Sequence, residues 1–290
     1  MLSAPMVKEL GDHIKVERSR QAAINFLFRH QWETVWPLFP SIPLIQGIFG
    51  ISAFALISHN MAISLAGIIT GVIFLLCFGI PPRSKEKHTH AQFSHNLKNF
   101  AHAFWPILFV AILYAATNTP PAIGLIIALP IYLYIHKVPT KRWAGFFKEG
   151  FNIDFALLIL GALLFKVNLE AGNAIDQVVA FLSEINMPQN FVIFFLPMLV
   201  AFLTGLTMPT VAITFLFLRP YIGTGEEAKI GLETLAFSGL ICGLFITPVH
   251  LCLALSATYF ETKLMKIIIK ILGPVIFIAC AGVLAAKFFE

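Results

Sequence analysis

Charged residues are scarce in this sequence, and the stretches without them are long. Of 290 residues, 58% are hydrophobic and 12% are charged, about half the charged share of a soluble domain. Five uncharged stretches approach or exceed the roughly 18 residues of a membrane span, and several have room for two. They are Thr34–Pro82, Asn99–His136, Ile185–Leu218, Thr234–Phe260 and Ile271–Ala286. The pattern excludes a soluble domain and predicts an all-α membrane protein, a polytopic helical bundle.

Cysteine pairs and enzyme motifs are also missing. The cysteines lie in apolar stretches with no Cys-x-x-Cys pair, at Cys77, Cys242, Cys252 and Cys280. We expect them to be small buried side chains that form neither disulfides nor a metal site. No HExxH, GxSxG or phosphate-binding glycine loop is present, so neither an enzyme nor a cofactor is expected. The first twenty residues are too polar for a signal-peptide core.

Basic residues gather in four loops, which hold fifteen of the twenty Lys and Arg residues: 8–20, 83–98, 137–148 and 261–270. Positive loops stay on the cytoplasmic side of a membrane. This explains the net charge of +5 without nucleic-acid binding and predicts an integral protein of the inner cell membrane. The second loop is rich in histidine, with His88, His90, His95 and His102 in or beside it. These lack acidic or Cys partners and predict a solvated loop rather than a metal site.

Hydroxyl groups and prolines interrupt the uncharged stretch that ends at Leu218. In hydrocarbon, a broken backbone is tolerated only against protein or a wet cavity. Pro209 suits the first turn of a new helix, and Thr207 can cap that helix. We therefore predict a re-entrant hairpin over 190–222, with Thr207, Met208, Pro209 and Thr210 at its tip. The alternative is a kinked helix whose hydroxyls bond back to the chain.

A second tip of the same kind stands at the N-terminus, where Ser3, Ala4 and Pro5 precede Met6 and Val7. The loop charges place the two tips on opposite sides, as inverted repeats require. We expect 1–150 to be the first repeat with scaffold spans, and 151–290 to be the second repeat with the hairpin. The first tip has no entering arm, which predicts an apolar stretch upstream or in a partner chain. Both tips are expected to line one cavity near the midplane.

Two further spans are interrupted. The segment Arg20–Ile57 contains Arg29, His30 and Glu33, and several prolines follow these residues within it. The segment therefore predicts a half-helix, an unwound stretch and a second half-helix. A turn is expected at His59-Asn60.

The second interrupted span covers Ile230–Phe260 and breaks at Thr247-Pro248-Val249-His250. Ionisable groups at membrane depth usually line a pathway or pair with each other. His250, with His30 and Glu33, is the candidate for proton coupling, and Arg29 is a candidate to hold a substrate's negative charge. The alternative is a structural ion pair between Arg29 and Glu33, with His250 as a satisfied core histidine.

The chain resembles an uncharacterised integral-membrane family, placed in the ion-transporter superfamily. The segments that carry the resemblance are Ser3 to Val7, Arg29 to Glu33 followed by Trp36-Pro37, and Thr247 to Leu253 with Tyr259-Phe260. That superfamily also holds gluconate permeases and dicarboxylate and citrate carriers. The resemblance covers essentially the whole chain and implies two re-entrant hairpins and an elevator or rocking carrier, often dimeric, driven by protons or sodium. The sodium-coupled dicarboxylate carriers have Ser-Asn-Thr tips. Neither tip here contains Asn, which argues against sodium and against a dicarboxylate.

The sequence as a whole predicts a secondary transporter for a small organic anion. The free N–H groups and positive dipole end of a half-helix suit an anion. We expect both tips and Arg29 to bind it, H⁺ rather than Na⁺ as the coupling ion, and a homodimer in the lipid bilayer. The alternative is a membrane subunit or sensor that keeps the fold without transport.

Overall fold

Among the described residues, three helical segments are long and apolar enough to cross a membrane. Ala53–Cys77, Ile230–Tyr259 and Leu264–Phe288 have mean hydropathies of 2.1, 2.0 and 2.5. These lengths and compositions indicate a membrane protein, as the sequence predicts. The described secondary structure is helical throughout, with no strand in it, which confirms the all-α class for that part of the chain.

The computed structural model describes residues 3–78, most of 105–139, scattered positions from 143 to 184, and 186–289. Contacts divide the chain into two units: Met1–Pro82 with Ala162–Glu290, and Arg83–Gly161. This division follows packing, whereas the predicted halves 1–150 and 151–290 follow a sequence repeat and stay a prediction. The four histidines of the basic loop lie outside the described residues.

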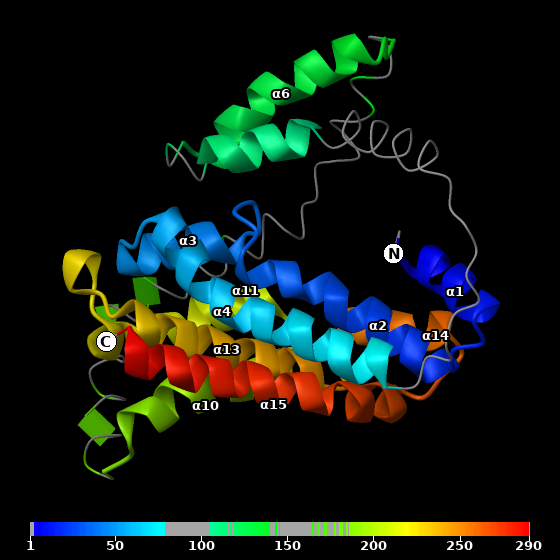
Figure 1. The fold of residues 1–290 in the computed structure, drawn as a ribbon. Coiled ribbons are helices and arrows are strands. Elements are labelled where there is room, and N and C mark those ends of the chain that lie inside the picture. Colours follow the sequence, from blue (N-terminus) through cyan, green and yellow to red (C-terminus); the bar gives the residue numbers. More distant parts are fainter. Residues whose placement is uncertain are drawn as a thin grey trace. The chain divides into compact units, whose positions relative to one another are not determined.

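The first unit begins with a helix and an interrupted helix. α1 (Ser3–His13) lies beside α2 (Arg18–His30), as Figure 1 shows. The 3₁₀ turn η1 (Gln31–Thr34) follows α2, and after an irregular stretch with two prolines the chain resumes as α3 (Ser41–Phe49). The predicted interruption of this segment is therefore confirmed.

The next helix corrects one sequence-based expectation. α4 (Ala53–Gly71), continued by the π-helical η2 (Val72–Cys77), runs through His59-Asn60 without a turn. The predicted turn there is wrong because both polar side chains find partners inside the helix packing. His59 Nδ1 bonds to the Ala55 carbonyl at 2.8 Å, and the buried Asn60 faces Glu233 of the central helix. The turn occurs earlier, at Gly50, whose φ of 70° ends α3.

A helical hairpin opens the C-terminal part of the unit. α10 (Gln189–Thr204) ends at Gly205, which has a φ of 65°. The chain resumes as α11 (Thr207–Thr210) and continues without a break through η4 (Val211–Phe215) into α12 (Leu216–Ile222). The outer ends of the two arms lie together, because Gln189 Nε2 donates to the Tyr221 carbonyl at 3.5 Å. The chain thus turns back on itself at Gly205-Leu206.

After the short 3₁₀ turn η5 (Gly225–Glu227), three helices complete the unit. They are α13 (Ile230–Ile246), α14 (Leu251–Tyr259) and α15 (Leu264–Phe288). The break between α13 and α14 falls on Thr247–His250, where the sequence predicts it. The second unit holds α6 (Pro121–Ile135) and the apolar helix Trp105–Tyr114. These two helices pack together, since a Cβ on Gly124 would lie 3.0 Å from Val110 Cγ1.

Exposed apolar side chains cover the outer faces of several helices in the first unit. They include Leu65, Ile69, Phe191, Phe195, Leu199, Ile269, Leu272 and Ile276. Faces of this kind suit lipid. Cys77 and Cys280 are exposed as well, Cys252 is half-buried, and only Cys242 of the four is buried. The expectation of four buried cysteines is therefore wrong, because an apolar stretch also supplies residues to the outer face.

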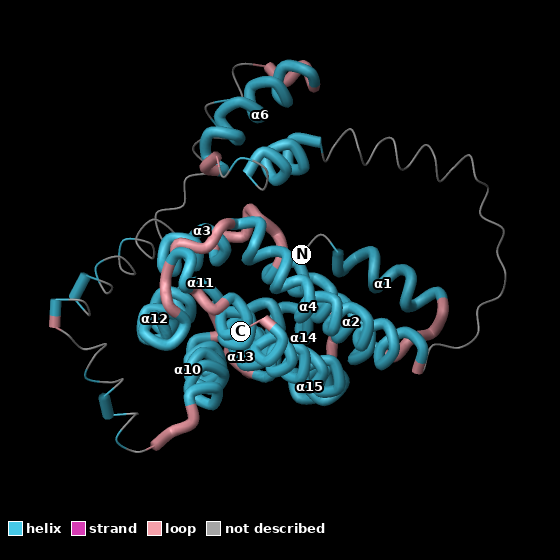
Figure 2. Tube along the Cα trace, turned by 60° about the vertical axis from the view of Figure 1, so that its left-hand side comes forward, coloured by secondary structure: helices cyan, strands magenta, loops and turns pink. Residues whose placement is uncertain are grey.

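The centre of the unit is α13, in which every residue from Gly231 to Phe245 is buried. It contacts α10, α15 and α4, and Figures 1 and 2 show these helices gathered around it. The closest approach is at two glycines four residues apart, Gly239 and Gly243. A Cβ at either would lie 2.1 Å from a carbonyl oxygen of α10, that of Phe194 or Met198. Small residues at this spacing let two helix backbones meet.

This contact predicts that Gly243→Ala destabilises the protein. The added methyl collides with a backbone atom, so α10 must move away from α13, at a cost of about 1–3 kcal/mol. Thermal unfolding of the purified protein measures it. Gly47→Ala in α3 is the matched control: a Cβ there meets nothing within 4 Å, and Ala favours the helix by about 1 kcal/mol. An unchanged melting temperature for Gly243→Ala would contradict the packing described.

Candidate functional site

Three interruptions of helical structure meet inside the first unit. One is the turn at Gly205-Leu206, the second is the break at Thr247–His250, and the third is the end of α2 at His30 with η1 after it. The first two touch directly, since a Cβ on Gly205 would lie 3.0 Å from the backbone nitrogen of His250. Only a residue without a side chain allows this approach, and its left-handed φ also favours glycine.

Side chains at these interruptions satisfy backbone groups that the helices leave free. Thr247 Oγ1 donates to the Phe202 carbonyl near the end of α10. His250 Nδ1 bonds to the Gly205 carbonyl at 2.6 Å. On the other side, Ser64 Oγ of α4 donates to the Gln31 carbonyl at 2.8 Å. The loosened backbone is therefore held by protein groups, which a site at membrane depth requires.

Thr207 has a different role from the predicted one. It is the first residue of α11, whose N-cap is Leu206, and no side chain caps the helix. Thr207 Oγ1 instead donates to Glu33 Oε2 at 2.8 Å. The predicted cap is wrong because the helix begins at Thr207 itself, so that Leu206 occupies the N-cap position. This bond joins the hairpin tip to η1 across 174 residues of sequence.

The other tip residues are arranged more conventionally. Pro209 lies in the first turn of α11, as predicted, and is half-buried together with Met208. Thr210 is buried, and its hydroxyl donates to the Leu206 carbonyl at 2.7 Å. Thr204 Oγ1 lies 3.2 Å from Thr210 Oγ1. The hydroxyl of Thr210 thus bonds back to the chain, as the kinked-helix alternative expects of it, whereas Thr207 reaches across to another element.

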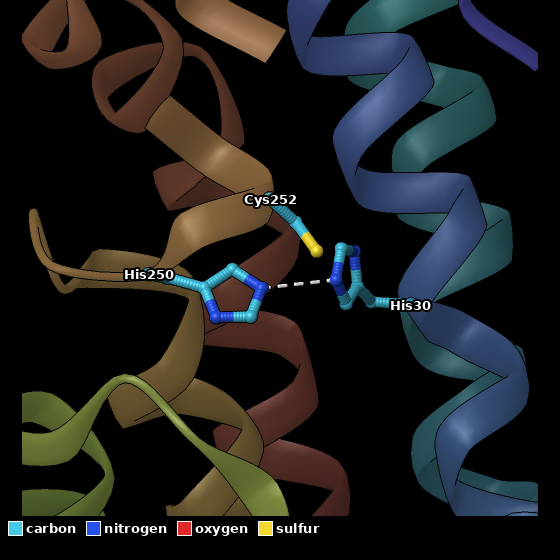
Figure 3. Close-up of side chains that lie close together, drawn as sticks. All are labelled: His30, His250 and Cys252. Atoms are coloured by element: carbon cyan, nitrogen blue, oxygen red, sulfur yellow. Dashed lines mark hydrogen bonds between the residues drawn. The ribbon is translucent and has the colours of Figure 1, made fainter. Parts of the chain in front are cut away.

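Two histidines face each other at the centre of the site. His30 Nε2 and His250 Nε2 are 3.0 Å apart and both side chains are buried. Figure 3 shows the two rings meeting through these atoms, with Cys252 beside them. The ring centroids are 5.0 Å apart at an interplanar angle of 70°. The prediction named His250, His30 and Glu33 as a group, and Glu33 Oε1 lies 3.6 Å from His30 Nε2.

The hydrogen bonds of the two rings require a cation between them. Each Nδ1 faces a backbone carbonyl, that of Phe26 at 2.7 Å for His30 and that of Gly205 at 2.6 Å for His250. A carbonyl only accepts, so each Nδ1 carries the proton, and in the neutral ring each Nε2 then has a lone pair. Two lone pairs 3.0 Å apart repel unless a proton or a metal ion lies between them. The pair is therefore built to hold a positive ion.

Arg29 lies beside this pair at a more exposed position. Its guanidinium donates to Cys252 Sγ at 2.8 Å. Glu33 bonds instead to Thr207 and faces His30, so the contacts of these described residues include no ion pair between Arg29 and Glu33. The structural ion pair that their spacing allows is not formed.

The first tip contacts another part of the interrupted helices. Ser3 Oγ donates to Asn25 Oδ1 at 2.8 Å, and Asn25 Nδ2 donates to Ser256 Oγ of α14 at 3.2 Å. Ala4 is fully buried and Pro5 is exposed. Asn25 precedes Glu33 by eight residues, about 12 Å of helix. The described contacts do not bring Ser3 or Pro5 to the second tip, and the single shared cavity stays a prediction.

A buried carboxyl group escaped the sequence analysis. Glu233, in the first turn of α13, is fully buried, and Asn60 Nδ2 lies 3.5 Å from its Oε1. Its Oε2 and the hydroxyl of Thr234 have no hydrogen-bond partner among the described residues. In the sequence analysis Glu233 lies inside the span Ile230–Phe260, but this carboxyl group has no assigned role there. The small residues Gly231 and Gly239 on the same helix are the signal that this turn lies inside the packing.

The contact between tip and η1 predicts that Thr207→Val destabilises the protein. Valine keeps the shape of the side chain but removes the donor to Glu33, which costs about 1–3 kcal/mol when a buried acceptor is left without its partner. Thr207→Ser keeps the hydroxyl and is expected to unfold close to the wild-type temperature. Thermal unfolding compares the three proteins, and equal melting temperatures for Val and Ser would contradict the assignment.

The chain was compared with known proteins in three ways. Residues 1–288 match the model of a family described as Protein of unknown function (DUF401). No curated protein and no solved structure matches the chain. The match extends over nearly the full sequence and includes both tips and both interrupted helices. The chain therefore belongs to the DUF401 family.

Proposed function

We propose that the protein is a secondary transporter that carries a small organic anion across the inner cell membrane. The observation that carries the proposal is the position of Arg29. Its guanidinium contacts Cys252, the second residue of α14. It thus lies at the N-terminal end of a helix that begins at a break within the candidate membrane span Ile230–Tyr259.

Both groups at this point attract negative charge. The first turn of a helix has N–H groups without intrahelical partners, and its dipole is positive there. Arg29 adds a full positive charge and several donors in a planar fork that matches a carboxylate. The Arg29 side chain is exposed, and its hydrogen bond goes to the sulfur of Cys252 and not to a carboxylate. A guanidinium at such depth is costly unless it serves a ligand or a pathway.

The order of elements supports a carrier architecture. The N-terminal part contains a tip helix α1, an interrupted helix from α2 to α3, and a long helix α4. The C-terminal part contains the tip helix α11–α12, the interrupted helix α13–α14, and the long helix α15. We infer two inverted repeats in a polytopic bundle, with the hairpin re-entrant. The relation to the ion-transporter superfamily, and a homodimeric state, belong to the same proposal.

The coupling ion stays a prediction. Sequence reasoning favours H⁺ over Na⁺, through His250, His30 and Glu33. The contacts between the buried His30 and His250, and between His30 and the half-buried Glu33, support this proposal. A membrane subunit or sensor without transport is the competing function, and uptake measurements separate the two.

The proposal predicts that Arg29→Gln strongly reduces uptake. Thermal stabilisation of the purified protein by a panel of organic anions first identifies a ligand. Uptake of that anion into liposomes containing the protein is then measured under an imposed gradient. Loss of one charge-assisted hydrogen bond costs about 1.5–3 kcal/mol, so binding by Arg29→Gln should weaken roughly 10- to 100-fold.

Two further variants control the experiment. Arg29→Lys keeps the charge and is expected to recover part of the uptake. Lys229→Gln removes the same charge at an exposed position before α13 and should transport like the wild type. Anion uptake by Arg29→Gln at the wild-type rate would refute the assigned site, and absence of uptake for every stabilising anion would favour the non-transporting alternative.

A further inference from the structure

We propose that His30, His250 and Cys252 form a binding site for a transition-metal ion of the Zn²⁺ class. Their ligand atoms, two imidazole nitrogens and one sulfur, all lie within 4.8 Å of one another. Figure 3 shows His30 approaching from α2, and His250 and Cys252 from the start of α14, around one point. Imidazole and thiolate are the ligands that Zn²⁺ prefers in proteins.

The distances fit such an ion with a small adjustment. Ligand atoms of a tetrahedral zinc site are about 3.3–3.6 Å apart, given metal–ligand distances of about 2.0–2.3 Å. The two Nε2 atoms are 3.0 Å apart and have to separate by a few tenths of an ångström. Cys252 Sγ has to move inward by about 1 Å to reach the ion at a normal Zn–S distance. Cys252 is half-buried, so its side chain has room to rotate.

The surroundings of the histidines match those of metal ligands. A metal-bound histidine usually donates its other ring N–H to a backbone carbonyl or a carboxylate, which fixes the tautomer. Both rings do so here, through the Phe26 and Gly205 carbonyls. The ring of Phe26 packs against both imidazoles, at centroid distances of 4.7 and 5.6 Å. Both lone pairs are therefore aimed at the same point before any ion arrives.

Nearby charges compensate part of the charge of the ion. A Zn²⁺ ion with a Cys252 thiolate keeps one positive charge, and Glu33, 3.6 Å from His30 Nε2, supplies a negative charge that offsets it. Arg29, which donates to Cys252 Sγ, adds a further positive charge at an exposed position. A shared proton needs only the two nitrogens, whereas the sulfur of Cys252 beside them offers a metal ion a third ligand.

The experiment measures metal binding at equilibrium in detergent, so its outcome does not depend on transport or on an anion. The purified full chain, freed of metal with a chelator, is titrated with Zn²⁺ against a chromophoric indicator. One ion per chain is expected. Loss of a residue that only hydrogen-bonds to a metal ligand weakens metal binding about 10- to 100-fold. Because His250→Gln and Cys252→Ser remove a ligand itself, each should weaken Zn²⁺ binding by more than about 100-fold.

Matched variants carry the same changes elsewhere. His59→Gln and Cys280→Ser alter residues outside the cluster, a histidine bonded to its own helix and an exposed cysteine. Both should bind Zn²⁺ like the wild type. The absorption spectrum of bound Co²⁺ supplies a second readout. It compares only the wild type with Cys252→Ser, so it does not require that variants of the buried histidines fold. The wild type is expected to show tetrahedral visible bands and a sulfur-to-cobalt charge-transfer band, and Cys252→Ser should lose the latter.

Three results would overturn the proposal. The first is a wild type that binds no Zn²⁺, which would leave a shared proton between the histidines. The second is wild-type Zn²⁺ affinity in His250→Gln and Cys252→Ser, when both variants elute and melt as folded proteins. The third is a Co²⁺ spectrum with the charge-transfer band unchanged in Cys252→Ser.

Discussion

Backbone groups freed by the helix interruptions must find partners without water, and this requirement organises the first unit. An unsatisfied carbonyl or N–H in an apolar medium costs several kcal/mol. Here side chains from other elements satisfy carbonyl groups at two of the interruptions. Thr247 and His250 bond to the Phe202 and Gly205 carbonyls at the end of α10, and Ser64 of α4 donates to the Gln31 carbonyl of η1. The contact between His250 and His30 then joins the three interruptions at one point.

The packing of α13 makes this junction possible. Glycines at 239 and 243 bring α10 against α13, which places the end of α10 beside the end of α13. Gly205 and His250 then meet at the point where both helices stop. His30 comes to the same point from α2, with Phe26 and Phe245 packed around it. The close approach of two helix backbones therefore sets the geometry of the polar centre.

The interruptions were predictable from sequence, because proline and threonine in an apolar stretch have local consequences. Pro209 and Pro248 mark breaks that the structure contains, and the predicted hairpin bounds differ from the helical ones by one residue at most. The partners at the breaks were not predictable. His30 and His250 are 220 residues apart, and nothing in either local pattern identifies the other. The local sequence predicts a cap at Thr207, since the bond of this side chain to Glu33 depends on tertiary packing.

The same limit explains the remaining errors. His59-Asn60 reads as a turn by local composition, but helix α4 continues since Asn60 finds Glu233 on a distant helix. Cys252 reads as an apolar filler until α2 brings Arg29 and His30 to it. The role of a single polar residue in an apolar stretch cannot be decided from its local sequence. Only the residues that it contacts in the fold show whether it forms a turn, fills the packing or offers a ligand atom.

The absence of a side chain at Gly205 lets the end of the hairpin contact His250 directly. The hairpin end is fastened to the break by two hydrogen bonds, Thr247 to Phe202 and His250 to Gly205. Any displacement of the hairpin end would break both bonds together and release Nδ1 of the His250 ring from its carbonyl partner. The position of α10 and the tautomer of His250 are therefore coupled through these two contacts.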